Sequence, residues 1–172
     1  MELARQVADE LKRLIGASVN SIREGKHQDA FDHLNQALSI TELIEYHAGS
    51  AMALYNLANL YVVTGENISA LETAAIALEK AKISLQDVQS YQKLLLTLLL
   101  AVQKDGASCA KNRDYSRALA CFEAALPHVA EEKKASLERQ ITLLRRVLNE
   151  RQGNGRGVQE NQRGGHEGGG NG

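Results

Sequence analysis

The sequence is poor in aromatic residues and in proline. Its 172 residues include no tryptophan, two phenylalanines, five tyrosines and one proline. A core built on large aromatic side chains is therefore excluded, and proline interrupts almost no helical segment. The apolar residues, 44% of the chain, are mostly leucine and alanine, which favour helices over strands. The length is that of one domain or of one short repeat array.

The chain has almost no net charge. Its 20 lysines and arginines against 21 aspartates and glutamates give a formal charge of -1 at pH 7. Nucleic acids and anionic membranes attract proteins through an excess of positive charge. The composition therefore predicts neither nucleic acid nor a membrane as a partner.

Long apolar segments are missing as well. The longest, residues 94–102, is interrupted by Thr97 and is about half as long as a bilayer-spanning helix. The first ten residues carry charges at every turn and lack the apolar stretch of a signal peptide. We therefore expect no membrane span and a cytoplasmic location.

Signatures of catalysis and of metal binding are also missing. The two cysteines, Cys109 and Cys121, lie in predicted helices without a Cys-x-x-Cys spacing, which is typical of reduced, packed thiols. The five histidines are scattered, and no phosphate loop, zinc-protease helix, nucleophile elbow or dinucleotide-binding motif is found. We expect a protein that is not an enzyme and uses no cofactor and no metal.

Two groups of residues could still suggest chemistry. Asp32 and His33 would suit a phosphotransfer histidine with an acidic neighbour, but a surface histidine beside Leu34 is the simpler interpretation. Glu42 and Glu45 could form a carboxylate pair. With no further polar group in register they are better interpreted as a solvated helix face.

Helical periodicity extends almost unbroken to residue 151. Short polar or glycine-containing segments divide it into seven predicted helices. These breaks are Gly25-Lys26, residues 47–50, Gly65-Glu66, and residues 83–86, 112–114 and 127–131. We therefore assign residues 1–151 to one helical domain.

The last residues have a different composition. Residues 152–172 are rich in glycine, and Val158 is their single sizeable apolar side chain. Such a segment buries too little surface to fold. The sequence predicts a disordered tail at 152–172.

Small residues recur in a fixed pattern along the helical part. Ser18, Ala58 and Gly106 mark three units; an alanine follows 12 residues later in each, and another alanine seven residues after that. The six alanines are Ala30, Ala70, Ala118, Ala37, Ala77 and Ala125. A small residue allows two helix backbones to approach closely at a crossing. Because a break separates the first two small positions in each unit, every unit is predicted to be helix, turn, helix.

These units resemble the tetratricopeptide repeat. In residues 53–71, the positions that match the family motif are Leu57, Ala58, Tyr61, Gly65 and Ala70. Residues 114–127 resemble the second helix of the motif, with Ala118, Phe122, Ala125 and Pro127 in place. The resemblance covers about four-fifths of the chain. It implies a right-handed superhelical array of three helical hairpins that binds a protein in its concave groove.

The repeats also depart from the family pattern. Ser18, Ala58 and Gly106 are 40 and 48 residues apart, whereas the standard period is about 34. Longer helices and loops must absorb the difference, as in the extended repeats of kinesin light chains and some bacterial regulators. Family members that hold the C-terminal carboxylate of heat-shock chaperones have Lys and Asn where this chain has Ile15 and Val19, which argues against that ligand.

The helix predicted after residue 131 has one apolar stripe. Leu137, Ile141, Leu144 and Leu148 recur at helical spacing. Repeat arrays need a terminal helix that is apolar on one side, so we interpret this segment as a cap. The same spacing suits a short coiled-coil seam, so a monomer and a weak homodimer through this helix both stay open.

The first helix of each unit supplies the candidate partner-binding surface, because the resemblance places these helices along the groove. Helical spacing selects residues on one face of each helix. They are Lys12, Ile15, Val19 and Arg23 in the first unit, Met52, Tyr55, Asn56, Asn59 and Val63 in the second, and Gln103, Lys104, Ala107 and Lys111 in the third. Amides, a tyrosine and several cations suit a peptide or helix with acidic groups.

The sequence thus predicts a non-catalytic adaptor or scaffold module that binds a peptide or a partner helix. A secretion-type tetratricopeptide chaperone of bacteria has a similar size, but its repeat spacing is shorter. A phosphorelay or enzymatic helical protein is the alternative from another class, and it lacks a reactive constellation.

Overall fold

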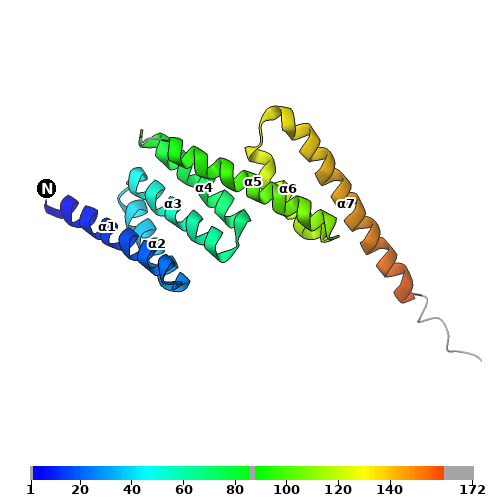
Figure 1. Ribbon diagram of the computed structural model, residues 1–172, viewed down its shortest axis with the longest axis horizontal. Helices are drawn as coiled ribbons and strands as arrows, with labels where there is room; N and C mark the ends of the chain where they lie inside the picture. The colour runs from blue at the N-terminus through cyan, green and yellow to red at the C-terminus, as the bar shows by residue number, and fades with distance from the viewer. Residues whose placement is uncertain (1, 86–87, 161–172) are drawn as a thin grey trace, which may run out of the picture. The chain divides into compact units, whose positions relative to one another are not determined.

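The computed structural model describes residues 2–85 and 88–160, and side chains within 4–85 and 88–152. In these ranges the chain consists of α-helices and contains no β-strand (Figure 1). The helices are α1 (Glu2–Arg23), α2 (His27–Leu43), α3 (His47–Thr64), α4 (Asn67–Ile83), α5 (Gln89–Lys111), α6 (Tyr115–Ala125) and α7 (Glu131–Glu160), with a 3₁₀ turn, η1 (Leu126–His128), before α7. The predicted all-α fold and the seven helices are confirmed within the described residues. The superhelical arrangement of the hairpins stays a prediction.

One predicted break is wrong. Residues 47–50 form the first turn of α3, and the chain reverses just before them, at residues 44–46. Gly49 lies in this turn, where it leaves space for neighbouring side chains. A Cβ atom on Gly49 would lie 2.5 Å from Tyr46 Cδ1 and 2.7 Å from Thr41 Cγ2. The breaks predicted at 25–26, 65–66 and 112–114 fall between helices, and those at 83–86 and 127–131 begin or end on the terminal residue of a helix.

Helices α1, α2, α3 and α5 end with the same hydrogen-bond pattern. A residue in the left-handed conformation follows each helix, and the next amide donates to the carbonyl five residues back. These bonds are Lys26 to Ser21 (2.8 Å), Tyr46 to Thr41 (2.8 Å), Glu66 to Tyr61 (2.8 Å) and Asp114 to Cys109 (2.9 Å). Gly25 (φ 73°) and Gly65 (φ 82°) adopt this conformation without strain. At the other two turns the non-glycine residues Glu45 and Arg113 adopt it.

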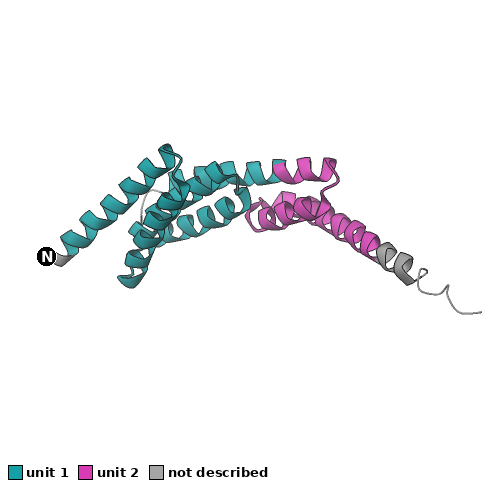
Figure 2. Ribbon diagram, turned by 90° about the horizontal axis from the view of Figure 1, so that it is seen from below, with its two compact units in different colours: residues 1–104 teal, residues 105–172 magenta. Residues whose placement is uncertain are grey.

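The chain forms two compact units, Met1–Lys104 and Asp105–Gly172 (Figure 2). Their boundary lies inside α5, where the helical periodicity has no break. The sequence predicted one helical domain to residue 151, and α7 continues past that point to Glu160. The rest of the predicted tail, residues 161–172, lies outside the described residues.

The first unit is built from two helical hairpins and residues 89–104 of α5. Helices α1 and α2 pack together, as do α3 and α4, and α3 also contacts α1 and α2 (Figure 1). Leu11, Leu14, Ala37 and Ala53 form one core cluster between the hairpins. Near the start of α5, Tyr91 joins a second cluster with residues of α3 and α4.

The small residues of the predicted repeat pattern all lie in the interior. Eight of them, Ser18 and the seven alanines, have no exposed surface, and Gly106 is buried. At Gly106 the helices approach so closely that a Cβ atom would lie 2.7 Å from Phe122 Cε1 and 3.0 Å from Cys121 Cβ. These positions are therefore buried, as predicted for small residues at close helix crossings.

In the second unit, α7 packs against α6. Leu137, Ile141 and Leu144 of the predicted apolar stripe are buried, and Leu148 is half-buried. The stripe is thus covered within its own unit, as expected of a capping helix, and little of it is left for a coiled-coil partner.

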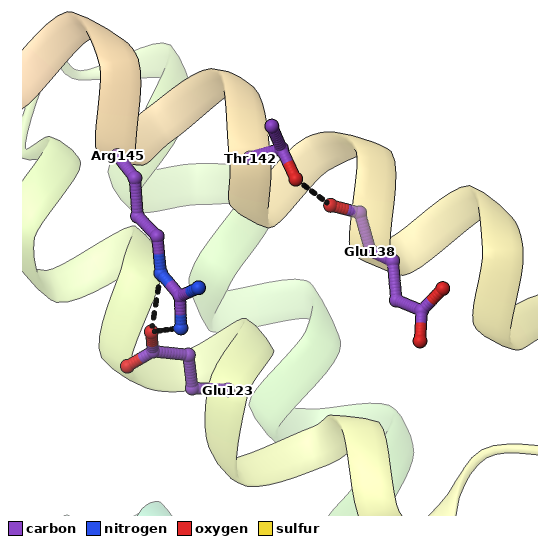
Figure 3. Close-up of polar contacts among 4 residues, drawn as sticks. All are labelled: Glu123, Glu138, Thr142 and Arg145. Atoms are coloured by element: carbon purple, nitrogen blue, oxygen red, sulfur yellow. Dashed lines mark hydrogen bonds and ion pairs between the residues drawn. The ribbon is translucent and has the colours of Figure 1, made fainter.

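Polar contacts between α6 and α7 are made at the surface. Both the Nε and the Nη2 of Arg145 donate to Glu123 Oε1, at 3.1 and 2.6 Å (Figure 3). Thr142 Oγ1 donates to the Glu138 carbonyl of the same helix at 2.9 Å (Figure 3). Because the Arg145 and Glu123 side chains are both largely exposed, this pair contributes at most about 1 kcal/mol.

Candidate partner-binding surface

On α1, the predicted surface is only partly available. Lys12 and Arg23 are exposed, whereas Ile15 and Val19 are half-buried. Ile15 packs against the core cluster that contains Leu14. Its main role is therefore in packing, and the two cations are the exposed part of this set.

On α3, apolar and amide side chains share the exposed face. Met52 and Val63 are 44% and 54% exposed, and their spacing of 11 residues places them on one side of the helix. Asn59, one helical turn before Val63, is half-buried rather than fully exposed. Its amide has no hydrogen-bond partner within the described part of the chain. It is therefore free to bond to a ligand.

Two other predicted residues of α3 are already engaged. The ring of Tyr55 meets the ring of Tyr91 edge to face, with centroids 5.5 Å apart. Burial raises the pKa of the Tyr91 phenol, with a further contribution from nearby Tyr55. The Asn56 amide donates to the Met52 carbonyl at 2.9 Å. Both side chains are therefore engaged within the protein and are less available to a ligand than the Asn59 amide.

On α5, the predicted residues are divided between the two units. Gln103 is half-buried and Lys104 is exposed in the first unit; Ala107 and Lys111 are exposed in the second. Sequence reasoning missed two further residues, Leu96 and Leu100, which are 59% and 58% exposed. Their signal was present, because steps of four residues back from Lys104 reach Leu100 and then Leu96. They lie within a leucine-rich segment, where leucine suggests a core.

The alternative sites have no supporting geometry. His33 is half-buried, not the surface residue expected, and its Nδ1 is buried without a hydrogen-bond partner among the described residues. Glu42 and Glu45 are exposed, as expected of a solvated face. Among the described side chains, no three His, Cys, Asp or Glu residues are grouped as a metal site.

The two cysteines are free thiols in the second unit. Cys121 is buried and Cys109 half-buried. Burial raises the pKa of the Cys121 thiol, and the nearby Cys109 and Asp105 raise it further. A thiol that stays protonated at neutral pH is a poor nucleophile.

Two surface hollows of the first unit lie elsewhere. One, of about 470 Å³, is formed by α1 and the α2–α3 turn, with Val7, Ile44 and Tyr46 in its lining. The other, of about 380 Å³, lies between α2 and the end of α3, beside Phe31 and Tyr61. None of the predicted surface residues lines either hollow.

In comparisons with known proteins, no family model matches the chain and no curated protein matches its sequence. The resemblance to the tetratricopeptide repeat therefore depends on the residues described above. In the described part of the chain, no helix is both long enough and apolar enough to cross a membrane.

Proposed function

We propose that this protein is a non-catalytic interaction module of the tetratricopeptide type. In this proposal three hairpins, α1–α2, α3–α4 and α5–α6, are closed by α7. A peptide or a partner helix binds along the exposed faces of the first helices. The buried small residues support the repeat interpretation.

The observation that carries the binding function is the exposure of large apolar side chains on α3 and α5. Met52, Val63, Leu96 and Leu100 are each at least 44% exposed. Large apolar side chains gathered on exposed helix faces are typical of binding surfaces. The free amide of Asn59 lies on the α3 face and adds a group that fixes a ligand by hydrogen bonding.

Affinity capture from native cell extract tests this function. The immobilised full chain is compared with Leu100→Glu and with Leu143→Glu, the latter on α7. Both leucines are exposed to a similar degree, 58% and 61%, so neither change should alter the free energy of unfolding by more than about 0.5 kcal/mol. We expect Leu100→Glu to weaken capture at least about ten-fold, because a charge then faces an apolar contact.

Leu143→Glu should capture the same protein as the unchanged chain. Circular dichroism checks that both variants are folded. Loss of capture in Leu143→Glu, with full capture in Leu100→Glu, would place the partner on the terminal helix and reject the proposed surface.

A further inference from the structure

Four residues form an exposed stripe along α5 within the first unit. The α5 stripe consists of Lys93, Leu96, Leu100 and Lys104, and all four are exposed. Their spacing of three, four and four residues places them on one face of the helix. The opposite face is buried and carries Leu98 and Val102. The stripe therefore points away from the core that α5 helps to form.

The two leucines lie between two positive charges. At a rise of 1.5 Å per residue, Lys93 and Lys104 are separated by about 16 Å along the helix axis. Within the described residues, neither lysine makes an ion pair. The stripe thus presents an apolar centre with an unneutralised cation at each end.

Carboxylates are few in the part of the chain around the stripe. Helix α3 contains no charged residue, and α5 has no Asp or Glu from Gln89 to Lys104. The described carboxylates between residues 47 and 104 are Glu66, in the α3–α4 turn, and Glu72 and Glu79, on α4. The positive charge of the stripe is therefore not offset by carboxylates of α3 or of residues 89–104 of α5.

We propose that the α5 stripe binds an acidic amphipathic helix. The helix carries two large apolar residues three or four positions apart, which pack around Leu96 and Leu100, and a carboxylate beyond each of them, which faces Lys93 or Lys104. A partner in helical form fits because the ridge from Leu96 to Leu100 matches the grooves between residues four apart on another helix. This inference rests on the proposed function and specifies its partner.

Fluorescence anisotropy with designed peptides tests the proposal on the full chain. The acidic probe is an alanine-based helical peptide of about 18 residues with two leucines four apart and glutamates flanking them. The basic probe has lysine at each glutamate position. We expect the acidic probe to bind about ten-fold more tightly than the basic one, and its affinity to fall as salt is added.

Charge reversal on the protein provides the control. Lys93→Glu combined with Lys104→Glu should reverse the preference, so that the basic probe binds more tightly. Lys80→Glu combined with Lys82→Glu makes the same change in net charge on α4 and should keep the acidic preference. Leu96→Ser combined with Leu100→Ser should weaken both probes at least about ten-fold.

Several results would overturn the proposal. Equal binding of the two probes, or equal effects of the α5 and α4 reversals, would show that the stripe does not select acidic ligands. A central proline should prevent the acidic probe from forming a continuous helix. If the probe with this proline binds as tightly as the original, the ligand is bound in extended form. Self-association of the chain that depends on Leu100, measured by sedimentation, would identify a second copy as the occupant. If the acidic probe fails while capture from extract still depends on Leu100, this inference is wrong and the proposed function stands.

Discussion

Ala118→Leu is expected to lower the free energy of unfolding by about 2 to 3 kcal/mol, whereas Ala120→Leu leaves it within about 0.5 kcal/mol. Both residues are alanines of α6, two positions apart. Ala118 has no exposed surface, and Ala120 is exposed. A leucine at 118 must push apart the helices that meet there, because a packed interior has no space for three more carbon atoms.

Urea unfolding of the full chain, followed by circular dichroism, measures both variants. Ala118→Val adds fewer atoms, so its urea midpoint should fall between those of the unchanged chain and of Ala118→Leu. This variant still tests the prediction if Ala118→Leu fails to fold. Equal midpoints for Ala118→Leu and Ala120→Leu would mean that the small residues of the repeat pattern are not at helix crossings.

Two glycine replacements should change stability in opposite directions. Gly106→Ala is expected to cost about 2 kcal/mol, because its Cβ would lie 2.7 Å from Phe122 Cε1 and 3.0 Å from Cys121 Cβ. Phe122 is itself buried, so its ring has little room to turn away. At Gly16 of α1 a Cβ would meet nothing within 4 Å. Gly16→Ala should therefore stabilise the protein by about 0.5 to 1 kcal/mol, since alanine favours a helix.

Thermal melting of the two alanine variants compares them directly. A lower melting temperature for Gly106→Ala together with a higher one for Gly16→Ala is the expected pair of results. A higher melting temperature for both would contradict the close approach of α5 and α6 at Gly106.

The features that sequence predicted well are those set by local chemistry. Helices follow from apolar periodicity, and the turns at Gly25 and Gly65 follow from the freedom of glycine in the left-handed conformation. The buried small residues follow from spacing, because a close crossing between two helices tolerates little beyond alanine.

The features that it missed depend on neighbours that are distant in the chain. The break predicted at residues 47–50 was wrong, because the close contacts of Gly49 with Tyr46 and Thr41 appear in the folded chain alone. Asn59, which the sequence assigned to the partner-binding surface, is half-buried. Leu96 was not singled out, although it lies two steps of four residues before Lys104, because a segment that consists mostly of leucine suggests a core.

Photocrosslinking from single positions tests the central claim, that the partner binds on the first helices, most directly. A photoreactive p-benzoylphenylalanine replaces Val63 on α3 in one version of the full chain and Ile76 on α4 in another. These side chains are 54% and 52% exposed, so both probes are equally accessible. After illumination in native extract, we predict that position 63 yields one defined crosslinked protein and that position 76 does not. A defined product from position 76, with none from position 63, would contradict the account.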